Sequence, residues 1–132
     1  MAPSPKVPIS WGELLDKITI LEIKSERIKS ERALASVRQE LAALSTVAGS
    51  IEGNHPALTQ LRTELKRVNE RLWDVENALR EKEAFKIFDH EFVQLARSVY
   101  QQNDQRGRIK REINELLGSE FVEEKLYTAY EA

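Results

Sequence analysis

The clearest pattern in this sequence is LTQLRTELKRVNERLWDVENAL, residues 58–79. Its aliphatic residues alternate three and four positions apart, which is the heptad spacing of a helix that packs along one seam. Pro56 precedes it, where the first turn of a helix tolerates a missing N–H. The pattern predicts a helix over 55–83, and its seam is Leu58, Leu61, Leu65, Val68, Leu72, Val75 and Leu79.

The preceding segment has a similar pattern. Ser10 and Glu13 have the spacing of a capping box, in which each side chain binds the other residue's backbone N–H. No strong helix breaker occurs between them and Gly49, so we expect a single helix over 10–48. Its seam has two polar members and consists of Ile20, Ile23, Arg27, Ser30, Leu34, Val37, Leu41 and Leu44.

A third helix is expected over 89–117, with Asp89 as N-cap and Gly118 as the left-handed residue after its end. The sequence therefore predicts an all-α fold. We expect three long helices in an antiparallel up-down-up bundle or coiled coil, followed by a short helix over 119–130. One long helix exchanged between two chains would give the same pattern. A single domain is expected over 10–132, after a flexible proline-rich tail over 1–9.

The first half of the first helix has a second apolar stripe, made of Leu14, Ile18 and Leu21. Because the second helix is shorter than the first, residues 10–20 are expected to project beyond it. A second copy of the chain would cover the extra stripe, which predicts a homodimer through the N-terminal half of the first helix. The charges of this half are expected at its margins, with Glu13 and Lys17 as an i,i+4 ion pair.

The expected helix register brings polar residues together at mid-bundle, namely Arg27, Ser30, Glu76 and Gln102, with Asn69 or Asn103 as a further candidate. An unpaired buried charge costs several kcal/mol, so a buried Arg27 requires a carboxylate, for which Glu76 is the candidate. Two interpretations are open. The layer either fixes the pairing of the helices or forms a small anion pocket.

Composition narrows the classes of function. Charged residues are 32% of the chain but the formal net charge is −2, which removes the strong electrostatic case for binding nucleic acid or an anionic membrane. There is no Cys, and His55 and His90 are far apart in sequence, so no metal or cofactor is expected. Glycine-rich phosphate loops and nucleophile motifs are absent, which speaks against an enzyme. No apolar run is long enough for a signal peptide or a membrane span, so we expect a cytoplasmic protein.

Two aromatic residues lie beside seam positions and are better candidates for a site. Trp73 follows Leu72 and is close to Glu76, and Tyr100 is within a helical turn of Arg97, Asn103 and Asp104. Such residues often belong to a secondary core, and they also build ligand or partner surfaces. Gly107 destabilises a helix by about 1 kcal/mol relative to Ala. Either the helix tolerates this cost, or glycine is needed there because another helix approaches closely.

Four stretches resemble a known family: ISWGELLDKITILEIKSERI (9–28), LWDVENALREKE (72–83), FDHEFVQLARSVYQQNDQRGRIKREIN (88–114) and GSEFVEEKLY (118–127). They are similar to a bacterial family of small proteins classed as a domain of unknown function, number 6165. The resemblance covers nearly the whole chain. It implies a helical fold and, for some members, association with tetratricopeptide or glycosyltransferase-like segments. It implies no activity. Its motif positions here are Ser10, Gly12, Glu13, Asp16, Lys17, Trp73, Glu76, Arg97, Tyr100, Asn103, Asp104 and Lys125.

A weaker resemblance is to the all-helical chorismate mutases, in which Arg27 and Arg38 would match two basic positions that hold the substrate's carboxylates. The early arginine of that family would fall near Ser10, and the second helix lacks a matching Arg/Asp pair.

Two hypotheses follow from the sequence. The first is a non-catalytic helical module for protein interaction or oligomerisation. The second is a helical enzyme or a binder of small anions or sugar nucleotides, with a polar pocket at mid-bundle. The candidate ligand or partner surface, shared by both hypotheses, comprises Glu13, Asp16, Lys17, Lys24, Arg27, Trp73, Glu76, Arg97, Tyr100, Asn103 and Asp104.

Overall fold

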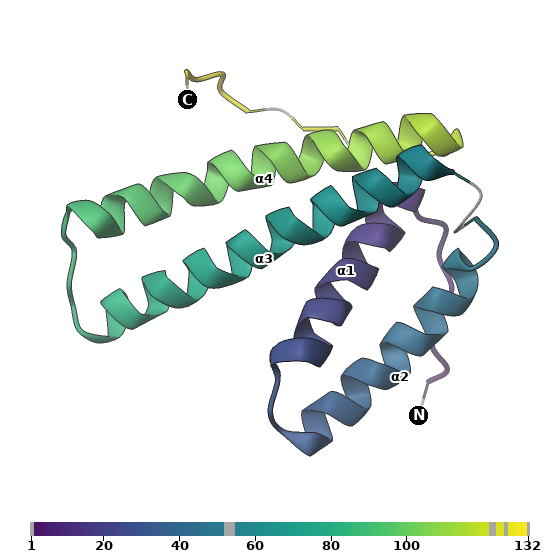
Figure 1. Cartoon of the computed structure of the whole chain (residues 1–132), viewed down its shortest axis with the longest axis horizontal. Helices are drawn as coiled ribbons and strands as arrows, with labels where there is room; N and C mark the ends of the chain where they lie inside the picture. The colour runs from purple at the N-terminus through teal and green to yellow at the C-terminus, as the bar shows by residue number, and fades with distance from the viewer. Residues whose placement is uncertain (1, 52–54, 122–123, 126, 132) are drawn as a thin grey trace.

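Four helices make up the fold in the computed structural model, which describes residues 2–51, 55–121, 124–125 and 127–131 (Figure 1). They are α1 (Trp11–Arg27), α2 (Glu31–Ala48), α3 (Pro56–Ala84) and α4 (His90–Leu117). No strand occurs in this part of the chain, so the all-α prediction is confirmed. Helices α1 and α2 form one hairpin, and α3 and α4 form a second, longer one (Figure 1). None of the helices in the described ranges is long and apolar enough to cross a membrane.

The prediction of one helix over 10–48 is wrong, because the chain turns between α1 and α2. Ile28 (φ −75°, ψ 134°) and Ser30 (φ −70°, ψ 122°) are both extended, and the Ser30 side chain accepts the backbone N–H of Ala33 as an N-cap. The heptad spacing keeps its phase across this turn, so apolar periodicity does not reveal it. The only sign in the sequence is that the two polar seam members, Arg27 and Ser30, flank the turn.

Helix α1 contacts each of the other three helices and supplies much of the core. Leu15 and Ile18 of α1 are fully buried, as are Leu65 of α3 and Ile113 of α4. The second apolar stripe of α1 is therefore covered within the chain, and the expected projection of residues 10–20 is wrong. The observation that motivated a dimer through α1 no longer holds, although a homodimer as such stays a prediction.

The end of the longer hairpin projects instead (Figure 1). Arg27, the last residue of α1, reaches Asp74 of α3, and the hairpin continues beyond that contact. We call residues 75–102 the arm. In the base of the hairpin Leu65 and Ile113 are fully buried, whereas the seam residues of the arm are only partly buried: Val75, Leu79, Phe92, Leu95 and Val99.

The helix ends follow the predicted chemistry except at the C-terminus. Ser10 accepts the N–H of Glu13, but the Glu13 side chain accepts from Lys110, so only one half of the predicted capping box is seen. Asp89 accepts the N–H of Phe92, and Gly118 is left-handed (φ 62°, ψ 42°). The short helix over 119–130 is wrong for the residues described, because 119–121, 124–125 and 127–130 are non-helical. Val122, Glu123 and Leu126 of that segment lie outside the described residues.

Gly12 allows α1 to approach α4 closely. Its backbone N–H donates to Oδ1 of Asn114 at 2.7 Å, and a Cβ at this position would lie 2.5 Å from the carbonyl oxygen of Lys110. The neighbouring N–H of Trp11 donates to the Ser119 hydroxyl at 3.0 Å. The beginning of α1 is thereby fixed to the end of α4.

Candidate functional site

A cluster of polar side chains is buried where α1, α3 and α4 meet. Asp16 of α1 is 2% exposed, and its Oδ1 and Oδ2 accept from Nε and Nη2 of Arg106 at 2.9 and 2.5 Å. The Asn69 amide donates to Asp16 Oδ1 at 3.0 Å and to Thr19 Oγ1 at 2.9 Å. We call these four residues the polar cluster. The bidentate geometry of Arg106 supplies the compensation that a buried carboxylate requires.

This cluster is a mid-molecule polar layer, but of its four members only Asn69 was among the predicted candidates. Arg27 was expected to pair with Glu76; it pairs instead with Asp74 at 2.5 Å and lies 5.9 Å from the centre of the Trp73 ring. Glu76 pairs with Arg80, one turn along α3, at 3.2 Å. The prediction was wrong because it assumed an unbroken first helix, which placed Arg27 in a seam.

The second ionic contact between α1 and α4 joins Glu13 to Lys110, at 2.8 Å. Lys110 is 5% exposed and therefore depends on that carboxylate. Lys17 reaches Glu40 of α2 at 3.4 Å. The predicted Glu13–Lys17 pair is therefore replaced by two contacts that each join α1 to a different helix.

A groove opens beside the polar cluster, between the end of α1 and the root of the arm. It has a volume of about 380 Å³, and we call it the junction groove. Its walls are mostly apolar, with charged side chains at the rim. Among its lining residues are Ile20, Ile23, Leu72, Trp73, Glu76 and Arg106.

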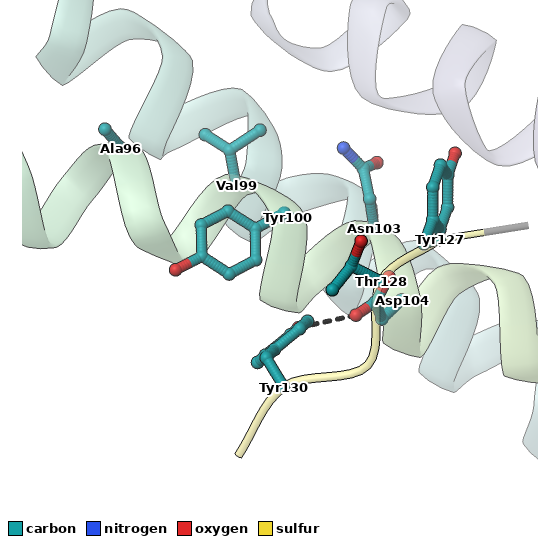
Figure 2. Close-up of a pocket in the computed structure, with 8 residues that line it drawn as sticks. All are labelled: Ala96, Val99, Tyr100, Asn103, Asp104, Tyr127, Thr128 and Tyr130. Atoms are coloured by element: carbon teal, nitrogen blue, oxygen red, sulfur yellow. Dashed lines mark hydrogen bonds between the residues drawn. The ribbon is translucent and has the colours of Figure 1, made fainter. Parts of the chain in front are cut away.

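A second groove of about 390 Å³ lies between α4 and the C-terminal segment (Figure 2). Tyr100 and Tyr130 meet edge to face, with ring centres 5.1 Å apart. The Tyr130 hydroxyl donates to Asp104 at 2.5 Å, and this bond to a carboxylate raises the pKa of Tyr130 above its ordinary value. Nε of Arg97 donates to the Tyr100 hydroxyl at 3.4 Å. The C-terminal segment therefore supplies one wall of this groove, which we call the C-terminal groove.

One hydrogen bond joins the linings of the two grooves. Asn103 lines the C-terminal groove and accepts from Nη1 of Arg106, which lines the junction groove, at 3.4 Å. The structure thus gathers most predicted site residues into one region. Asp16, Arg27, Trp73 and Glu76 lie at or beside the junction groove, and Tyr100, Asn103, Asp104 and Arg97 lie at or beside the C-terminal groove. Lys17 and Lys24 line neither groove.

The sequence interpretation missed Arg106, Lys110, Tyr127 and Tyr130 as members of this region. The available signal was the position of Arg106 in the apolar stripe of its helix, where a charge needs a partner. Its partner Asp16 is 90 residues away, too far for any local spacing to indicate.

The contacts of the polar cluster are those of a structural feature that holds α1, α3 and α4 together. Both oxygens of Asp16 are engaged by Arg106, and Asn69 adds a further donor. A general base or an anion pocket would need such groups directed toward a ligand. Within the described ranges, no three His, Asp or Glu side chains are grouped to hold a metal ion.

Comparison with known proteins gives a family and no activity. Residues 5–131 match the model of a family described as of unknown function, DUF6165. No curated protein and no solved structure matches the chain.

Proposed function

The chain belongs to this family of unknown function, and we propose that it is a non-catalytic interaction module whose arm accepts the helices of a partner protein. One observation carries the proposal. The stripes of α3 and α4 that face α1 at the base of the hairpin continue along the arm, where nothing in the described part of the chain covers them fully.

The stripe on α3 can be followed from its contacts with α1. Asn69 is hydrogen-bonded to Asp16 and Thr19, and residues three or four positions apart share a helix face. The same face therefore passes through Leu72 and Trp73 to Glu76 and Arg80. All four line the junction groove, in which α1 provides only the inner wall.

The stripe on α4 runs the same way. Asn114, Lys110 and Arg106 each bond to α1. Stepping back along the helix by three or four residues, the face passes through Asn103 and continues as Val99, Ala96 and Phe92, all of them partly exposed. The arm thus continues the surface that α1 covers at the base, and no helix of the described residues covers it there. Ala96 and Val99 also line the C-terminal groove.

The tip of the arm extends this surface. Phe85 is 76% exposed and Phe88 56%, with Ile87 and Val93 beside them also exposed. Isolated exposed apolar residues need no explanation, but a cluster of large ones on a projecting element is typical of a protein interaction site. Four such residues within nine positions, at the end of a hairpin, form that kind of cluster.

The alternative function, an anion or sugar-nucleotide pocket, receives less support from the contacts. Arg106 is directed at Asp16 and Asn103, and Arg27 at Asp74. A bound anion would have to compete with these carboxylates for the same guanidinium donors. The contacts favour the interaction module.

A photo-crosslinking amino acid placed at Asn77 tests the proposal. Asn77 is exposed and lines the junction groove, and Gln39, exposed on α2, is the matched control position. Irradiation of living cells is expected to give a discrete adduct from position 77, with a second copy or another protein, and none from position 39. The additional change Ala96→Arg should remove the adduct without altering the helical circular dichroism signal. Absence of an adduct at 77, or the same adduct from both positions, would overturn the proposal.

A further inference from the structure

We infer that the partner on the arm is a second copy of this chain, and that two arms pack face to face about a two-fold axis near Ala78. This inference rests on the proposed function and names its partner. It moves the dimer interface from α1, where the sequence predicted it, to the far half of the α3/α4 hairpin.

The first argument is that this face already accepts a helix of the same chain. At the base, α1 lies across α3 and α4 and buries Leu65, Val68 and Ile113. A hairpin of two helices alone leaves its seam half exposed, and adding two more helices converts it into a four-helix arrangement with a closed core. A second arm supplies two helices of the required kind.

The second argument is the spacing between the exposed apolar residues at the tip of the arm and the groove at its root. The tip presents exposed Phe85 and Phe88, and the root carries the junction groove beside Trp73. Trp73 and Phe85 are twelve residues apart, about 18 Å along a helix at 1.5 Å per residue. A two-fold axis halfway between them brings each tip to the other copy's groove, so one operation fills both grooves and covers both tips.

The third argument is complementarity of charge. Glu76 and Arg80 lie on either side of Ala78, on the same face of α3, and form an i,i+4 pair with side chains 42% and 73% exposed. In an antiparallel pairing of α3 with its copy, residues equidistant from the axis meet. Glu76 then faces Arg80 of the second copy, and Arg80 faces its Glu76. The interface has two opposite-charge pairs and no facing like charges at these positions.

The oligomeric state in solution tests the inference, measured by sedimentation equilibrium on the full chain. The unmodified chain is expected to be a dimer. Ala96→Arg adds bulk and charge to the α4 stripe and is expected to give a monomer. Ala35→Arg, the same change at an exposed position of α2, is expected to leave the dimer intact. Helix content and melting of each variant show that the fold is kept.

A charge exchange tests the register of the two arms. Glu76→Arg alone and Arg80→Glu alone place like charges opposite one another, and each should raise the dimer Kd at least tenfold, about 1.4 kcal/mol. The double variant E76R/R80E restores opposite pairing and should recover the original Kd. Because both side chains are well exposed, these changes leave the core of the hairpin untouched.

The outcomes separate this inference from the proposed function. A dimer that Ala96→Arg does not dissociate overturns the inference. A chain that is monomeric, yet still gives an adduct at position 77 that Ala96→Arg removes, overturns the second copy as partner and leaves the interaction module standing. A monomeric chain that gives no adduct at position 77 overturns both the second copy as partner and the interaction module.

Discussion

The carboxylate of Asp16 joins three helices at one point. It is bonded to Arg106 of α4 and Asn69 of α3 while belonging to α1. A buried ion pair of this kind adds little to stability compared with apolar packing, but removing one partner is costly because the other charge is left buried. Its clearest effect is on specificity, since only one register of the three helices brings these groups together.

Removing the guanidinium of Arg106 is therefore expected to be strongly destabilising. Arg106→Met leaves the Asp16 carboxylate buried with only amide donors, and the free energy of unfolding should fall by about 3–5 kcal/mol. Urea denaturation followed by circular dichroism measures it. The double variant D16L/R106M removes both charges and should recover most of the loss. If D16L/R106M is destabilised as much as Arg106→Met, the unpaired buried charge is not the cause of the lost stability.

Two glycines that look alike in the sequence should respond oppositely to alanine. A Cβ on Gly12 would meet the Lys110 carbonyl oxygen at 2.5 Å, and this oxygen belongs to a helix backbone that cannot yield easily. A Cβ on Gly107 would meet the Lys125 side chain at 3.7 Å, an ordinary contact. Gly12→Ala is expected to lower the free energy of unfolding by about 1–3 kcal/mol, and Gly107→Ala to raise it by up to about 1 kcal/mol. Urea titration of the two variants measures the sign of the change in the free energy of unfolding for each. If Gly12→Ala were more stable than the unmodified chain, the close approach of α1 and α4 would be contradicted.

At the scale of elements, one side chain contacts both helices at the corner between α3 and α4. Asp89 accepts the N–H of Phe92 at 2.9 Å and receives Lys82 from the end of α3 at 3.0 Å. It therefore caps the start of α4 and ties it to α3, and so fixes the direction in which the arm turns back.

Acid should release this corner. The backbone N–H of Phe92, and then Lys82, hold the pKa of Asp89 below its ordinary value of 3.8. A lowered folded-state pKa means that the carboxylate stabilises the fold above pH 3.8 and that this contribution is lost as the pH falls through the lowered pKa. Asp89→Asn keeps an oxygen acceptor without the titration. The difference in Tm between the unmodified chain and Asp89→Asn is expected to be largest near neutral pH and to shrink in acid. A difference that does not change with pH would show that the charge plays no part.

At the scale of the whole molecule, features that depend on residues close together in the sequence could be predicted. Features that depend on residues far apart in the sequence could not. The helix ends at Ser10, Asp89 and Gly118 were predictable, because the capping residue and its partner are within a few positions. The turn at Ile28–Ser30 was not, since the heptad phase is the same on both sides. The predicted overhang had the right cause, an unequal length of helices, but fell on the wrong hairpin once the first helix was divided. The Asp16–Arg106 pair was not predictable from local spacing, because its two residues are 90 positions apart.

The fixed junction between the two ends of the domain has a consequence for how the chain is made. Trp11 and Gly12 bond to Ser119 and Asn114, so α1 completes its contacts only after α4 has been synthesised. Until α4 emerges from the ribosome, the core around Leu14, Leu15 and Ile18 lacks Ile109 and Ile113, so part of the apolar surface of α1 stays exposed on the nascent chain. The complete junction between α1 and α4 therefore forms only after translation has passed Ser119.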